Sequence, residues 1–141
     1  MGLTTAFNSG ALAVANGSVN FASDACYAIL VNGYELNKAH TAYSDVSAAE
    51  LSTAGDYDRV ALAGKAVSIV GGKVRYNCND VAFGNPVSIG PADGIVFLKG
   101  AAATPGASDA LLFYAPLSDV TSTNSQFSIT VPNGLYEHTI A

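Results

Sequence analysis

The segment spanning residues 66 to 77 constrains the fold most, because it predicts a β-hairpin that defines its own register. The stretches Ala66–Val70 and Lys73–Asn77 are joined by Gly71-Gly72, and a two-glycine loop suits the positive backbone angles of a type I′ turn. In that register Ile69 lies opposite Val74 on an apolar face, and the other face is polar. A shift of one residue would exchange the faces. The chain is therefore expected to build antiparallel sheet.

Several further segments have the pattern of strands. A mostly apolar run at residues 25–31 predicts a buried strand, and the continuous apolar runs at 95–98 and 111–114 predict central strands that are covered on both faces. Residues 126–131 alternate, which places Phe127, Ile129 and Val131 on one half-buried face. A turn at 132–134 then leads into a last strand at 135–140.

Other segments predict helices and connections. Leu3, Phe7, Ala11 and Val14 recur at helical spacing ahead of Asn16-Gly17, so a short helix is expected at residues 3–15. Ser47 and Glu50 have the spacing of a capping box, which predicts one short helical turn. The stretch at 100–110 is expected to be a loop, and the Ser- and Thr-rich stretch at 118–125 an exposed connection.

Short strands divided by turn signals favour a mainly β fold. We expect an antiparallel β-sandwich of jelly-roll-like type, with the short N-terminal helix and one additional helical turn. A closed barrel is the alternative. The 141 residues fit a single β-rich domain covering residues 1–141.

The composition bears on possible partners. Half of the residues are apolar and only 12% are charged, which indicates either a surface covered by partners or an apolar count inflated by small residues. The net charge is -5, and the basic residues are scattered, so direct nucleic-acid binding is not expected. No apolar run reaches the length of a membrane span and no export signal is recognised. Cys26 and Cys78 are accordingly expected to be reduced, buried thiols.

The side chains that most often carry chemistry do not form a recognised motif. His40 and His138 lack a nucleophile and a carboxylate at any spacing typical of a catalytic triad. Asp56 and Asp58 flank Tyr57, but the rest of a calcium loop is missing. We therefore expect no enzymatic activity, no catalytic residue, no metal and no cofactor.

Short sequence words spread over most of the chain carry a resemblance to a known family. The words are the segment at residues 43–50 (YSDVSAAE), those at 61–67, 79–83 and 94–99, and those at 111–117 and 124–129. In order and pattern they resemble a family of small structural proteins of tailed-bacteriophage virions. Proteins of this size and β content in such particles are similar to capsid decoration, or cement, proteins.

The resemblance implies a function and a location. It implies a protein made in the host cytoplasm and located on the capsid surface of the virion, where it binds the outer shell and stabilises capsomer contacts. Its partners would be the major capsid protein and neighbouring copies of itself, as a homo-oligomer, without nucleic acid or membrane. The alternative is a tail, neck or fibre-base adaptor, and a third reading is a host-glycan-binding module with a platform at Tyr34, Tyr57 or Tyr136.

Surface complementarity is all that a decoration protein needs, so the expected site is a partner interface. The N-terminal segment, the loop at 101–110 and exposed strand edges are the candidate regions. The residues expected to contribute are Leu3, Phe7, Val14, Tyr43, Pro105 and Tyr136.

Overall fold

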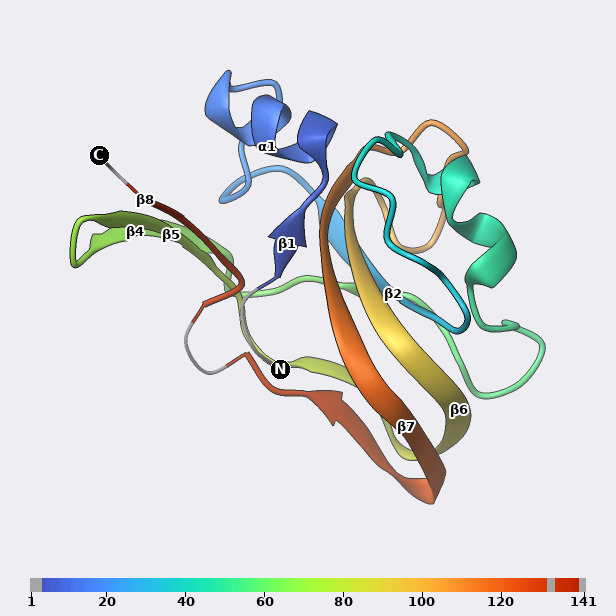
Figure 1. The fold of residues 1–141 in the computed structure, drawn as a ribbon. Coiled ribbons are helices and arrows are strands. Elements are labelled where there is room, and N and C mark those ends of the chain that lie inside the picture. Colours follow the sequence, from blue (N-terminus) through green and yellow to red (C-terminus); the bar gives the residue numbers. More distant parts are fainter. Residues whose placement is uncertain (1–3, 132–133, 140–141) are drawn as a thin grey trace.

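The computed structural model describes residues 4–131 and 134–139, which form two open antiparallel sheets (Figure 1). The large sheet has the order β1-β7-β6-β2-β3, and the small sheet has the order β4-β5-β8. The strand bounds are β1 Thr5–Ala6, β2 Cys26–Val31, β3 Val60–Ala61, β4 Ala66–Val70, β5 Lys73–Asn77, β6 Val81–Lys99, β7 Leu111–Ile129 and β8 Tyr136–Thr139. The predicted mainly β, antiparallel class is confirmed.

Parts of three predictions lie outside the described residues. These are the predicted contact residue Leu3, two residues of the turn at 132–134, and the end of the last strand at residue 140.

The core is built on the centre of the large sheet. All six residues of β2 are buried, as are residues 95–98 of β6 and 111–115 of β7. Alternate residues of these strands enter two apolar clusters, so Ala28 and Leu30 belong to one cluster whereas Tyr27 and Ile29 belong to the other. Both faces of the sheet are thus covered, which confirms the prediction for the runs at 95–98 and 111–114.

The polar stretch at 118–125 corrects a prediction, because it is strand and not a connection. It forms the outer part of β7 and pairs with β6, with Ser122 opposite Ile89. The Ser122 hydroxyl donates to the Val87 carbonyl at 2.8 Å. Several register shifts interrupt the pairing between Ala82 and Gly94. A ribbon that extends beyond the core tolerates polar side chains on both faces, and so the sequence lacks the usual strand pattern.

The helix α1, Asn8–Ala15, is shorter than expected, because residues 5–6 form β1 and pair with β7. Two 3-10 turns, η1 (Tyr43–Asp45) and η2 (Ser47–Ala49), replace the single predicted helical turn. The predicted capping box is wrong: η2 has no side-chain cap, and the Ser47 hydroxyl donates to Ser44. The Glu50 carboxylate has other partners, described below.

The predicted hairpin is confirmed in detail. Strands β4 and β5 pair with Ile69 opposite Val74 and Val67 opposite Tyr76. Gly71 and Gly72 both have positive φ angles, 56° and 77°, as a type I′ turn requires. The hairpin and β8 project from the large sheet toward the left of Figure 1.

The two cysteines are free and buried, in agreement with the reduced thiols expected. Burial raises the pKa of Cys26 and raises that of Cys78 to about 11. Neither thiol therefore carries much thiolate near neutral pH. Within the described part of the chain, no helix has the length and apolar character needed to cross a membrane.

Candidate interaction surface

One face of the small sheet is turned toward helix α1 and leaves a groove between them. The face consists of alternate residues that share register positions across the three strands. We call it the inner face; its residues are Val67, Ile69, Val74, Tyr76, Tyr136 and His138. We call the space between it and α1 the α1 groove.

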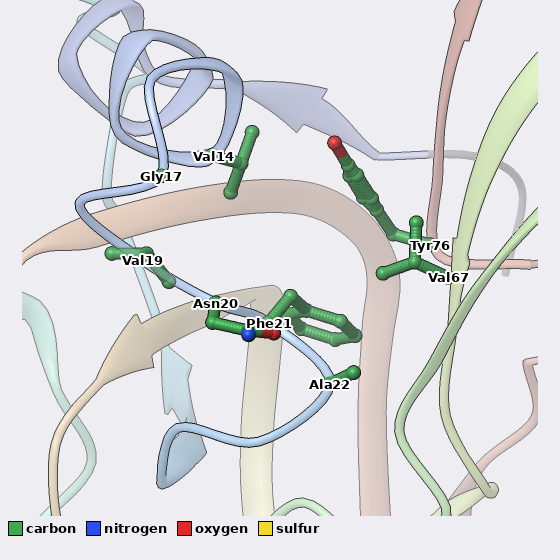
Figure 2. Close-up of a pocket in the computed structure, with 8 residues that line it drawn as sticks. All are labelled: Val14, Gly17, Val19, Asn20, Phe21, Ala22, Val67 and Tyr76. Carbon is green, nitrogen blue, oxygen red and sulfur yellow. The ribbon is translucent and has the colours of Figure 1, made fainter.

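The α1 groove consists of two adjoining hollows that share Val14 and Tyr76. The larger has a volume of about 450 Å³ and is lined by Ala11, Ala15, Val74, Tyr136 and His138 in addition to the shared pair. The smaller has a volume of about 310 Å³ and reaches Phe21 and Val67. Figure 2 shows Val14 on the helix side and Tyr76 with Val67 on the sheet side of this smaller hollow. The lining is almost entirely uncharged.

Aromatic packing holds the inner face in place against the large sheet. Tyr136 stacks on Phe113 with ring centroids 4.9 Å apart, and Tyr76 stacks on Phe21 at 5.9 Å. Phe113 is fully buried in the core. The floor of the α1 groove is thus fixed by the fold, and a partner would meet a preformed surface.

The outer part of the inner face is exposed to solvent. Ile69 is 74% exposed and Val67 is 44% exposed. The opposite face of the small sheet carries its charges, where Glu137 pairs with Arg75 at 3.1 Å and with Lys73 at 3.4 Å. Exposed aliphatic side chains on one ordered face typically mark a contact surface for another protein.

The structure places two of the predicted contact residues in the α1 groove and buries a third in the core. Val14 and Tyr136 both line the larger hollow, although they are far apart in the sequence. Phe7 is a correction: its side chain is fully buried in the core and its N–H donates to the Leu112 carbonyl at 3.0 Å. Helical spacing placed Phe7 on the apolar stripe of the predicted helix, but the residue precedes α1 and packs in the cluster that contains Tyr27 and Leu111.

Tyr43, in the turn η1, and Pro105, in the loop at 100–110, belong to a second region, and both segments lie at the right of Figure 1. Backbone bonds join the turn η1 to the loop at 100–110, since the N–H of Tyr43 donates to the Asp109 carbonyl at 2.9 Å. The Asp109 carboxylate accepts from the Tyr27 hydroxyl and the Gly106 N–H, each at 2.9 Å. This region is therefore an anchored loop, distinct from the α1 groove.

Sequence reasoning missed a buried polar cluster around Glu50. Its side chain is only 4% exposed, and Arg59 binds both carboxylate oxygens, at 2.8 and 3.0 Å. The hydroxyls of Tyr43 and Tyr57 also donate to the same carboxylate, the latter at 2.7 Å. Tyr57 in turn accepts from the Leu30 N–H at 3.2 Å. The cluster fastens the long connection between β2 and β3 to the edge of β2, which makes it a structural element.

The Tyr57 hydroxyl predicts a loss of stability at alkaline pH. Burial and the neighbouring Glu50 charge raise its pKa. A raised folded-state pKa means that the stabilisation is complete below the unfolded tyrosine pKa of about 10 and is lost above it. We expect this residue to contribute a fall of ~1.4 kcal/mol per pH unit above about pH 10. Urea unfolding at pH 9, 10 and 11 should show a shallower fall for Tyr57→Phe than for the parent chain, and equal slopes would contradict the assignment.

The other side chains considered as catalytic or metal-binding candidates make ordinary structural contacts. The Tyr34 hydroxyl and a His40 ring nitrogen lie 2.8 Å apart, and His138 lines the α1 groove. The Asp56 carboxylate accepts from the Ser88 N–H at 2.7 Å. No group of three or more His, Cys, Asp or Glu side chains that could hold a metal ion occurs within residues 4–131 and 134–139.

The tyrosines considered as a glycan platform do not form one surface. Tyr57 is 4% exposed and its hydroxyl is bound within the Glu50 cluster. Tyr34 packs edge-on against Tyr114, and Tyr136 stacks on Phe113.

Comparison with protein-family models, with curated proteins and with solved structures gave no match to this chain.

Proposed function

We propose that this chain is a non-enzymatic structural protein whose work is done by surface contacts, and that it is a decoration protein of a tailed-phage capsid. It binds the outer shell, contacts the major capsid protein and neighbouring copies of itself, and stabilises the contacts between capsomers. It needs no cofactor, nucleic acid or membrane for this role. The virion surface is its place of action after synthesis in the host cytoplasm.

The observation that carries the proposal is the α1 groove with its exposed inner face. A preformed, uncharged hollow beside exposed aliphatic residues fits an apolar protein segment and offers nothing to an ionic ligand. The order of short sequence words along the chain supports the choice of a virion partner. In this proposal the α1 groove receives an apolar segment of the major capsid protein.

A second region supports the proposed bridging role. The anchored loop with Tyr43 and Pro105 is separate from the α1 groove, and a protein that ties capsomers together needs two contact regions.

The proposal also includes the single domain and the jelly-roll-like sandwich predicted from the sequence. The stacking of Tyr136 on Phe113, which joins the small sheet to the large one, supports the single domain.

The test uses expanded heads assembled without this chain. Purified protein should co-sediment with such heads and raise their temperature of rupture. Ala15→Lys places a long charged side chain in the α1 groove and should abolish both effects. The matched control is Ala82→Lys, at an exposed position on β6 away from the α1 groove. Equal binding by both variants would contradict the role of the groove, and no binding by the parent chain would contradict decoration.

The adaptor and glycan alternatives predict different results in the same assay. An adaptor should bind only at the portal vertex or tail, in few copies, and should leave the rupture temperature of the shell unchanged. A glycan-binding module should retain host polysaccharide in isolation and ignore the heads.

A further inference from the structure

Beside the buried core, the edges of the large sheet differ from the outer edge of β4 because they are short and covered. The strand β3 has only two residues, and the neighbouring edge of β2 is capped by bonds such as that from the Leu51 N–H to the Leu30 carbonyl at 3.1 Å. On the opposite side, the Leu111 N–H donates to the Thr41 carbonyl at 3.0 Å. Such coverage prevents sheets from pairing edge to edge.

β4 has none of the usual protecting features. It is one of the two edge strands of the small sheet, and all five of its residues are exposed. Its sequence, Ala-Val-Ser-Ile-Val, contains no charge and no proline, and it pairs with β5 without a register shift. An edge of this kind is a template for another strand.

The hairpin geometry determines which backbone groups of β4 are available. Across a two-residue turn, the flanking residues Val70 and Lys73 form a hydrogen-bonded pair, and bonded pairs then alternate along the hairpin. Ser68 therefore directs its N–H and C=O toward β5. Val67 and Ile69 direct theirs outward, so four backbone groups are available to a partner strand.

We propose that β4 pairs with β4 of a second copy of this chain, antiparallel about a two-fold axis at Ser68. In this register Val67 lies opposite Ile69 of the second copy, and each strand overlaps the other over its full length. The outward groups of Val67 and Ile69 then form four hydrogen bonds across the axis. The two strands join two three-stranded sheets into one six-stranded sheet.

Side-chain and charge complementarity favour a second copy over an unrelated strand. Because paired residues share a face, Val67 and Ile69 from both copies gather on the continuous inner face, which covers Ile69, the most exposed large aliphatic side chain among the described residues. Lys65, just before the strand, lies opposite Gly71 of the second copy, so no lysine meets another. This dimer is a property of the chain alone and does not depend on a role in the virion.

Cross-linking tests the register directly. At a non-hydrogen-bonded antiparallel pair the Cα atoms are about 4.5 Å apart, within the range that a disulfide spans. Ser68→Cys should therefore oxidise to a covalent dimer. Ala66→Cys, on the same face, should not, because the two copies of residue 66 would be about 13 Å apart. The parent chain is the background control, since Cys26 and Cys78 are buried.

Analytical ultracentrifugation of the full chain tests the dimer without cross-linking. The parent chain should be in a monomer–dimer equilibrium, and Ile69→Lys should raise the dimer dissociation constant about 100-fold through two lost aliphatic contacts. Ile69 is mostly exposed in the monomer, so this variant should keep the parent urea midpoint at concentrations at which both chains are monomeric. A parent chain that stays monomeric at every concentration, or equal cross-linking of both cysteine variants, would overturn the proposal.

Discussion

Replacing Glu50 by alanine is expected to lower the free energy of unfolding by about 3–5 kcal/mol, the largest effect of any single change considered for this chain. The substitution leaves the Arg59 guanidinium without its carboxylate and the Tyr57 hydroxyl without its acceptor, both in a mostly buried setting. Unpaired buried charge and unsatisfied hydroxyls cost far more than the bonds themselves contribute. The loss approaches the whole stability of a marginally stable domain.

Urea unfolding of Glu50→Ala beside Glu35→Ala measures this effect. Glu35 is exposed, so its removal controls for the loss of a negative charge without the loss of a buried network. Glu35→Ala should change the free energy of unfolding by no more than about 0.5 kcal/mol. A cost for Glu50→Ala below about 1 kcal/mol would show that the connection between β2 and β3 is held by other contacts.

Replacing Gly10 by alanine should destabilise the protein, although the same change in an exposed helix stabilises it by about 1 kcal/mol. A Cβ atom at position 10 would lie 2.6 Å from the carbonyl oxygens of Leu111 and Leu112 and 2.7 Å from the Leu112 Cα. Backbone of a central strand cannot move aside, so α1 must lift away from β7. The expected cost is about 1–3 kcal/mol, as for other overpacked sites.

The control for this prediction is Gly55→Ala, where an added Cβ meets nothing within 4 Å. Because α1 forms one wall of the α1 groove, Gly10→Ala should also weaken binding to heads, which Gly55→Ala should leave unchanged. An increase in stability for Gly10→Ala would contradict the close packing of α1 on β7.

Local patterns in the sequence predicted the parts of the fold that local chemistry determines. The register of the hairpin follows from its two glycines and from its alternation of apolar and polar residues. The same alternation at residues 126–131 predicts the burial of Phe127, Ile129 and Val131. The central runs of β6 and β7 are buried because only a covered strand tolerates continuous apolar sequence.

Contacts between distant segments account for what the sequence did not predict. The stretch at 118–125 becomes strand because β6 pairs with it, and β6 contains Pro86 and Pro91, which conceal its strand character. Glu50 has capping-box spacing, yet Arg59 and two tyrosines from other segments bind it. The helical stripe that included Phe7 indicated its apolar role but not that the large sheet would bury it.

The exposed edge of β4 is a surface feature that the sequence alone did not predict. Its apolar alternation predicts a buried face, whereas within this chain Ile69 remains mostly exposed. The difference is consistent with an assembly in which a second copy and a capsid protein cover what the monomer leaves open. The two surfaces adjoin on β4, since Val67 lines the smaller hollow, whereas Ala15 lies on the helix side of the α1 groove alone.

The position of this chain in the purified virion tests the proposed function most directly. A cryo-EM map of the particle, together with quantitative mass spectrometry of its proteins, should place copies over the whole head shell, each with its α1 groove against a capsid subunit. Copies confined to the portal vertex or the tail, or the absence of the chain from the particle, would contradict the decoration role.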